Sequence, residues 1–150
     1  MKHLSTLICL VFIAPLVSAA QPEGYRITSI KHPGEGLFHV TGLDIDKDGT
    51  VYTCTRYGDI WALREGEWQQ FTQGLHEPCG LLCDDDGSLV VAQKPELTRL
   101  VDGNKDGFAD EYIKLSRAWK FHNNYHEFHY GVVKGNDGKY YGTLNLSHGD

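Results

Sequence analysis

Short runs in which apolar and polar residues alternate fill most of this chain after residue 36, and turns rich in glycine and aspartate separate them. Such alternation is typical of antiparallel strands with one buried face. In three places a glycine is followed seven residues later by the glycine of an Asp-Gly turn, in the pairs Gly42/Gly49, Gly80/Gly87 and Gly131/Gly138. Each copy therefore predicts a strand, a hairpin turn and a second strand.

The predicted strands group into units of four. The first unit has strands over 38–46, 50–56, 60–64 and 68–72, and the second over 79–83, 88–93, 97–101 and 111–115. A third unit begins near Phe128 and reaches its second strand at 139–146. Four antiparallel strands in about 40 residues are typical of one β-propeller blade. The prediction is therefore an all-β fold, the N-terminal blades of a β-propeller, at 36–75, 76–118 and, incomplete, 119–150. A small two-sheet β-sandwich is the alternative, although a sandwich would not explain why the strand–turn–strand pattern repeats.

The start of the chain has the pattern of an export signal. A basic residue, Lys2, precedes an apolar run over 4–17 and the small residues 18–20, which is typical of a secretory signal peptide at 1–20. We therefore expect a secreted or periplasmic protein with a leader at 21–35 and no membrane span. Removal of the signal changes the formal charge from −6 to −7. This acidic balance argues against nucleic acid as a partner.

Three cysteines follow the signal peptide, at positions 54, 79 and 83. An oxidising compartment permits a disulfide. Cys79 and Cys83 are four residues apart in one predicted strand, which separates them by roughly 13 Å, too far for a direct bond. A disulfide from Cys54 to one of the other two is therefore the expected pairing.

The two ends of such sheets differ in the connections that they carry. The Asp-Gly hairpins share one end, whereas the turns between second and third strands and the blade-to-blade connections share the other. Loops on a rigid scaffold concentrate binding residues, so this second end is the candidate site, with a plain polar loop surface as the alternative. Its polar residues are Arg56, Tyr57, His76, Glu77, Lys94, Glu96, His122, Asn123, Asn124, His126 and His148.

The segment from His126 to Asn145, which reads HEFHYGVVKGNDGKYYGTLN, resembles the soluble quinoprotein glucose and sorbosone dehydrogenases, which use pyrroloquinoline quinone (PQQ). The chain is also similar, over roughly residues 36–150, to the large exported bacterial propellers called membrane-bound dehydrogenases. This resemblance implies a six-bladed propeller in the full protein. It also implies PQQ as cofactor, a sugar or related alcohol as small-molecule substrate, and a c-type cytochrome as electron acceptor.

The resemblance also assigns roles to individual residues. His126 matches the base that takes the substrate's hydroxyl proton, and imidazole suits this role because it titrates near neutral pH. Arg56 and Lys94 would supply positive charge to the cofactor. His76 and Glu77 open the second blade at the place where a polar family residue approaches the cofactor.

Two segments have the spacing of metal ligands. His122, His126 and His129 could serve zinc, copper or iron, although their neighbours favour a loop over the helix that this spacing needs. The second segment, which begins at Asp102, resembles a calcium-binding loop. The loop's ligand positions 1, 3, 5, 7 and 9 are Asp102, Asn104, Asp106, the carbonyl of Phe108, and Asp110. Position 6 is glycine, as in calcium loops, and position 12 is Ile113. This loop would hold Ca²⁺ in a structural role, or it is a solvated acidic turn.

Two further functions are consistent with the same fold. One is a non-enzymatic propeller that binds glycan or protein partners through the polar end. The other is a gluconolactonase-like hydrolase, in which a metal held by carboxylates and asparagine activates water.

Overall fold

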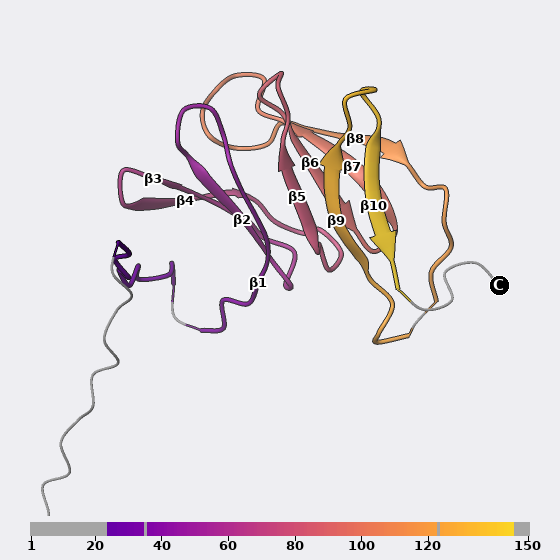
Figure 1. Ribbon diagram of the computed structural model, residues 1–150, viewed down its shortest axis with the longest axis horizontal. Helices are drawn as coiled ribbons and strands as arrows, with labels where there is room; N and C mark the ends of the chain where they lie inside the picture. Colours follow the sequence, from indigo (N-terminus) through magenta and orange to yellow (C-terminus); the bar gives the residue numbers. More distant parts are fainter. Residues whose placement is uncertain (1–23, 35, 123, 146–150) are drawn as a thin grey trace, which may run out of the picture. The chain divides into compact units, whose positions relative to one another are not determined.

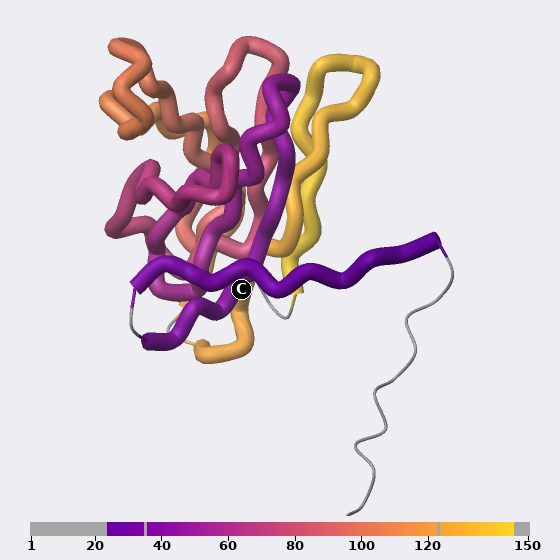
Figure 2. Tube along the Cα trace, turned by 90° about the vertical axis from the view of Figure 1, so that its left-hand side faces the viewer, coloured from indigo at the N-terminus to yellow at the C-terminus, as the bar shows by residue number. Residues whose placement is uncertain are grey.

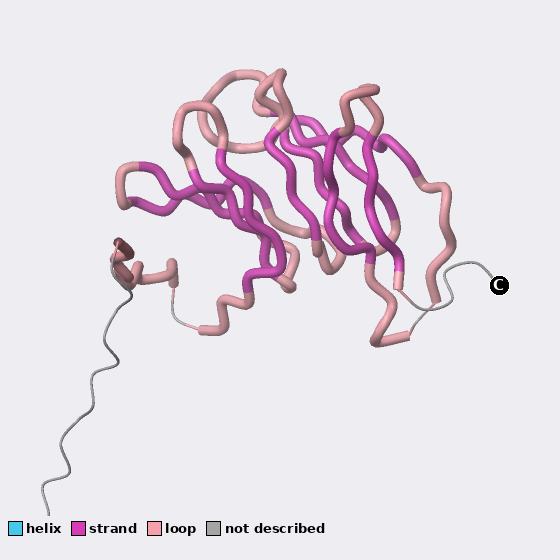
Figure 3. Tube along the Cα trace, viewed as in Figure 1, coloured by secondary structure: helices cyan, strands magenta, loops and turns pink. Residues whose placement is uncertain are grey.

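The structure is a computed structural model that describes residues 24–34, 36–122 and 124–145. In these ranges the chain forms ten strands and no helix (Figure 3). Residues 24–30 belong to a separate unit without regular structure, and every strand belongs to the unit that begins at Lys31. No helix among the described residues has the length and apolar character needed to cross a membrane.

The strands form three antiparallel sheets, each in simple up-and-down order (Figure 1). The first sheet contains β1 (Val40–Ile45), β2 (Val51–Thr55), β3 (Ile60–Arg64) and β4 (Glu67–Thr72). The second contains β5 (Gly80–Cys83), β6 (Leu89–Gln93), β7 (Glu96–Val101) and β8 (Glu111–Ser116). The third pairs β9 (His129–Lys134) with β10 (Tyr140–Leu144). These strands match the predicted ones to within two residues at most ends.

The three Asp-Gly turns have the same backbone geometry. In each, two backbone hydrogen bonds of 2.8–3.1 Å close the hairpin. The bonds are Asp46 N–Thr50 O and Gly49 N–Asp46 O, Asp84 N–Ser88 O and Gly87 N–Asp84 O, and Gly135 N–Lys139 O and Gly138 N–Gly135 O. Gly49 has a φ of +84°, a conformation that glycine adopts without steric cost. The three hairpins lie at one end of the sheets in both views (Figures 1 and 2).

The first strands of the three sheets, β1, β5 and β9, lie next to one another. The backbone approach is closest at Gly80, where an added Cβ would stand 2.6 Å from the carbonyl carbon of Gly131. A parallel bridge also joins Cys79 to Tyr130. Close backbone packing between sheets thus explains Gly42 and Gly80, whereas Gly131 has a φ of +65°, a conformation that favours glycine.

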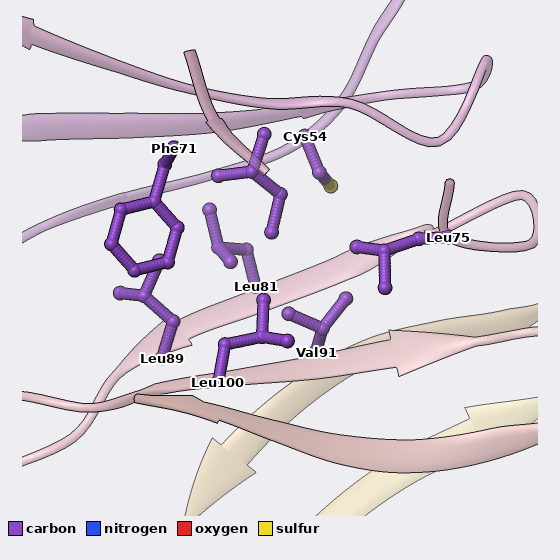
Figure 4. Close-up of a cluster of buried hydrophobic side chains, with 8 residues drawn as sticks. Cys54, Phe71, Leu75, Leu81, Leu89, Val91 and Leu100 are labelled. Atoms are coloured by element: carbon purple, nitrogen blue, oxygen red, sulfur yellow. The ribbon is translucent and has the colours of Figure 1, made fainter. Parts of the chain in front are cut away.

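Strand β6 of the second sheet is buried on both faces. One core cluster, shown in Figure 4, joins it to the first sheet through Cys54, Ile60, Phe71, Leu75, Leu81, Leu89, Val91 and Leu100. A smaller cluster joins it to the third sheet through Val90, Ala92, Leu97 and Val132. Successive residues of β6 therefore serve opposite faces, and each buried aliphatic side chain contributes about 1.5–3 kcal/mol.

The expected disulfide is absent, because Cys54, Cys79 and Cys83 are all free thiols. Burial raises the pKa of Cys54 to about 11 and that of Cys83 to about 12. A thiol held protonated in this way exchanges poorly with disulfides. The cysteines therefore contribute to the fold as small apolar side chains.

Candidate functional site

Three charged side chains from separate connections meet at the end of the sheets opposite the Asp-Gly turns. Arg56 follows β2, Glu77 lies between β4 and β5, and Lys94 follows β6. Glu77 contacts both cations: its Oε1 lies 3.4 Å from Nη2 of Arg56, and its Oε2 lies 3.4 Å from Nζ of Lys94. The strand order predicted from the sequence places these connections at one end, and the structure brings the three side chains together. Their role as cofactor ligands stays a prediction.

Lys94 and Glu77 are held by their surroundings. The Lys94 side chain is only 6% exposed, and a buried ammonium is costly without partners. It donates to Glu77 and, over 2.9 Å, to the carbonyl oxygen of Asn124. Glu77 has a φ of +46°, which non-glycine residues rarely adopt, and such strain persists only where contacts maintain it. Backbone strain of this kind often marks functional sites, and here it accompanies a carboxylate placed between two cations.

Two aromatic rings cover this charged cluster. The Arg56 guanidinium lies 4.6 Å from the ring centre of Tyr125 and 5.5 Å from that of Phe128, and its Nη1 donates to the Tyr125 hydroxyl over 2.9 Å. The bond with Tyr125 raises the pKa of Arg56 above its ordinary value. The Lys94 ammonium is 5.8 Å from the Phe128 ring. The cluster thus places two cations and two aromatic rings around one carboxylate. Arg56 and Tyr125 are its accessible members, because Lys94 and Phe128 are buried.

His76 lies beside the cluster and does not contact Glu77 through its ring. Its carbonyl accepts from the backbone of Lys94 over 3.0 Å, and its ring packs edge-on against Phe121 with centroids 5.9 Å apart. These two contacts hold His76, in the connection that follows β4, at the edge of the charged cluster.

His126, the predicted base, is exposed and packs edge-on against Tyr125 with ring centroids 5.1 Å apart. Its backbone N–H donates to Asn124 Oδ1 over 3.0 Å. Within the described ranges, no hydrogen-bonding partner contacts its imidazole. Nothing in this part of the chain therefore fixes the tautomer of His126.

A second histidine has the partner that His126 lacks. His122 Nδ1 lies 3.1 Å from Oε1 of Glu127, and the backbone N–H of His122 donates to Oε2 over 2.6 Å. From the sequence, Glu127 has no predicted role, and His122 is predicted only as a polar loop residue or metal ligand. No signal in the sequence indicated this burial, because glutamate is rarely buried unless it is paired.

His129 is part of the core. Its side chain is buried, and its ring packs edge-on against Trp119 with centroids 4.4 Å apart. Because His122 and His126 are exposed while His129 is buried, the three do not form one metal site. Across all described residues, no group of three or more His, Cys, Asp or Glu side chains is placed to hold a metal ion. Two other residues of the predicted site, Asn123 and His148, lie outside the described residues.

The predicted calcium loop, residues 102–110, is organised by its own side chains. Both Asp102 carboxylate oxygens accept backbone N–H groups, from Asp106 over 3.2 Å and Gly107 over 2.8 Å. Asp110 accepts from the backbone of Gly103 and from the side-chain amide of Asn104. The oxygen donors that calcium prefers are gathered in one loop, but three carboxylates do not converge in this arrangement. Calcium binding here stays a prediction.

Comparison with known proteins identifies the fold. No family model matches the chain, and no curated protein matches its sequence. A virginiamycin B lyase from Staphylococcus aureus superposes with a TM-score of 0.50 and 15% identity, covering 71% of this chain and 34% of that one. A Thermus thermophilus protein assigned provisionally as an oxidoreductase (glucose dehydrogenase) superposes with a TM-score of 0.59 and 19% identity, covering 73% and 37%.

Both solved neighbours are β-propellers, and this chain spans about a third of the length of each. The prediction of an all-β chain that forms blades of a β-propeller is therefore confirmed. At 15% and 19% identity, these two likenesses show the fold.

Proposed function

We propose that this chain belongs to an exported quinoprotein-like dehydrogenase that oxidises a sugar or related alcohol with a PQQ-type cofactor. The observation that carries the proposal is the convergence of Arg56 and Lys94 on Glu77 beneath Tyr125 and Phe128. PQQ is a planar aromatic tricarboxylate, and cations with aromatic faces are the groups that such a molecule requires. The likeness to a propeller oxidoreductase supports the proposal at the level of the fold.

Different residues of this chain would bind the cofactor and accept the proton. Arg56 would hold a cofactor carboxylate, the buried Lys94 would contribute positive charge, and Glu77 keeps the two cations in place. Tyr125 would lie against the cofactor plane. When bound, PQQ supplies a two-electron acceptor for hydride. A histidine at this end, which the resemblance gives as His126, would take the hydroxyl proton, and a c-type cytochrome would receive the electrons.

Calorimetric titration of PQQ into the purified full-length protein, with and without calcium, tests this proposal. We expect saturable, calcium-dependent binding. Replacement of Arg56 or Lys94 by glutamine removes a charge-assisted contact and should weaken binding by about 10- to 100-fold. Lys139→Gln is the matched control: Lys139 is a 75% exposed lysine that pairs with Asp137 in the third Asp-Gly hairpin, at the opposite end, and it should bind as the wild type does.

Two results would overturn the proposal. One is the absence of saturable binding by protein shown to be folded. The other is equal weakening in the Lys139→Gln control, which would indicate a general charge effect. Either result would favour the non-enzymatic function, and a glycan array would then be the next screen.

A further inference from the structure

In the second sheet, the first and third residues after the repeated glycine pack on the preceding sheet. They are Leu81 and Cys83, and both belong to the core shared with the first sheet. In the third sheet the first such residue is Val132, which packs in the smaller core shared with the second sheet. The equivalent residues of the first sheet, Leu43 and Ile45, are 56% and 55% exposed. The first sheet therefore presents the same packing positions, uncovered by the described part of the chain.

The opposite face of each sheet uses other positions of the repeat. The third residue after the Asp-Gly glycine is Tyr52, Val90 or Tyr141 in the three sheets. Tyr52 packs against the core shared by the first two sheets, and Val90 belongs to the core shared by the second and third. Tyr141 is 52% exposed, and its cross-strand partner Val133 is 61% exposed. The third sheet thus presents the kind of surface that receives a following sheet.

The repeated glycines show the same difference between occupied and open junctions. A Cβ added at Gly42 would stand 3.2 Å from the backbone nitrogen of Leu81, and one at Gly80 would stand 2.6 Å from the carbonyl carbon of Gly131. Each of these two glycines therefore meets the following sheet. At Gly131, no atom of the described residues lies within 4 Å of an added Cβ. The close approach that glycine permits is used at two junctions and is open after the third sheet.

The two open surfaces match because the chain already joins such surfaces twice, with the second sheet between the other two (Figure 1). Leu43 and Ile45 lie just before the first Asp-Gly turn, and Val133 and Tyr141 flank the third. Because all three turns lie at one end of the sheets, a second copy in the same orientation would bring the two patches together. Residues 31–38 cover another part of the first sheet through the ring contacts of Phe38 with Trp61 and Trp68.

We propose that two copies of this chain assemble head to tail, each with the open face of its third sheet against the first sheet of the other copy. The interface is heterologous, because it joins two different surfaces, and such an interface closes into a ring or grows into a filament. Since the described part of each chain has three sheets, a ring of two copies has six, within the roughly 4–8 blades of closed propellers. Burial of the exposed apolar side chains drives the contact.

Sedimentation velocity of the full chain tests this assembly and needs neither cofactor nor turnover. We expect the wild type to reach a dimer and to remain a dimer as its concentration rises. Leu43→Lys and Val133→Glu each place a charge in both contacts of the ring, because every contact uses both surfaces. Each variant alone should therefore raise the dissociation constant of the dimer at least about tenfold. Phe108→Lys, in the 102–110 loop, is the control and should dimerise as the wild type does.

An equimolar mixture of Leu43→Lys and Val133→Glu makes the test specific for a head-to-tail contact. One contact of the mixed ring joins two unaltered surfaces, and the other pairs lysine with glutamate. The mixture should therefore dimerise at concentrations where neither variant does so alone, and far-UV circular dichroism checks that both variants are folded. Three results would overturn the proposal: a wild type that stays monomeric at its highest soluble concentration, growth beyond the dimer, or a mixture that associates no more than the single variants.

Discussion

Gly80 lies where the first strands of the second and third sheets approach most closely. An added Cβ would stand 2.6 Å and 2.8 Å from two backbone atoms of Gly131, and backbone atoms cannot move aside without displacing a strand. We expect Gly80→Ala to lower the free energy of unfolding by about 2 kcal/mol, which corresponds to roughly 8 °C in Tm. Thermal unfolding followed by circular dichroism measures this change.

Gly103→Ala is the matched control for this substitution. A Cβ at that position would meet only Asp110 Oδ2, at an ordinary contact distance of 3.6 Å. Its stability should stay within about 0.5 kcal/mol of the wild type. Equal losses in the two variants would show that the cost comes from losing glycine and not from the approach of the sheets.

Asp84 joins the second sheet to the third. Its buried carboxylate contacts Lys134 Nζ at 2.5 Å and Arg99 Nη2 at 3.2 Å, and it accepts from the Tyr140 hydroxyl. Burial alone would raise the pKa of Asp84, but the hydrogen bonds from Lys134, Tyr140 and the backbone of Asp85 outweigh it and lower the pKa to about 2. Since the unfolded value is about 3.9, this carboxylate stabilises the fold above about pH 4. That contribution is lost as the pH falls through about 2.

Asp84→Asn should therefore destabilise the protein at pH 7 by about 3 kcal/mol, because it leaves two cations without their buried partner. The difference from the wild type should shrink as the pH falls from 4 to 2. Urea unfolding across this range measures both effects. Asp85→Asn is the control, since Asp85 also pairs with Lys134 but is 92% exposed, and it should change stability by less than about 1 kcal/mol. A constant difference at every pH would contradict the assigned pKa.

At the scale of elements, the repeat made the strands and hairpins predictable. Alternation placed β3 at its observed bounds, and the Asp-Gly dipeptides placed all three tight turns. The connection at 117–128 could not be predicted in the same way, because it has no periodic pattern and is organised by distant partners. Trp119, for example, donates to the carbonyl of Lys94 over 2.9 Å. His126, the predicted base, lies in this connection, so its surroundings could not be predicted from the sequence.

The loop at 102–110 belongs to the second sheet but docks on the first. Gln69 Nε2 donates to the Asp106 carbonyl over 3.1 Å, and the Ala109 N–H donates to the Phe71 carbonyl over 2.9 Å. We predict that calcium binds this loop and stabilises the junction of the two sheets. At a calcium concentration tenfold above Kd the gain is about 1.4 kcal/mol, or roughly 5 °C in Tm.

Melting curves in calcium, in magnesium and in chelator measure this gain. Asp102→Asn should abolish the calcium shift, whereas Asp48→Asn, in the first Asp-Gly hairpin, should retain it. A Tm that is the same in calcium and in chelator would identify the loop as a solvated acidic turn, already closed by its own hydrogen bonds.

At the scale of the molecule, the candidate site is assembled from connections far apart in the chain. Arg56 and Tyr125 are 69 residues apart and share a hydrogen bond. No local motif contains such a pair. The cluster of Arg56, Glu77 and Lys94 could be predicted only because the order of the repeated strands places these connections at one end of the sheets. The aromatic cover depends on packing, which the register does not specify.

The first and third sheets each carry apolar side chains that are exposed among the described residues. Leu43 and Ile45 on β1 are 56% and 55% exposed, and Val133 and its cross-strand partner Tyr141 are 61% and 52% exposed. Contiguous apolar surface of this kind promotes association. We therefore predict that the purified chain self-associates as its concentration rises, which sedimentation velocity measures.

Lysine at both faces should suppress this association. The double variant Leu43→Lys/Val133→Lys introduces charge into each patch and should sediment as a monomer at concentrations where the wild type does not. Phe108→Lys is the control: Phe108 is 52% exposed but lies in the 102–110 loop and not on β1, β9 or β10, so this variant should associate as the wild type does. Equal sedimentation of all three proteins would mean that these exposed apolar residues do not mediate self-association. Suppression in the double variant alone would show that the open sheet faces, the surfaces on which propeller blades pack, drive the contact.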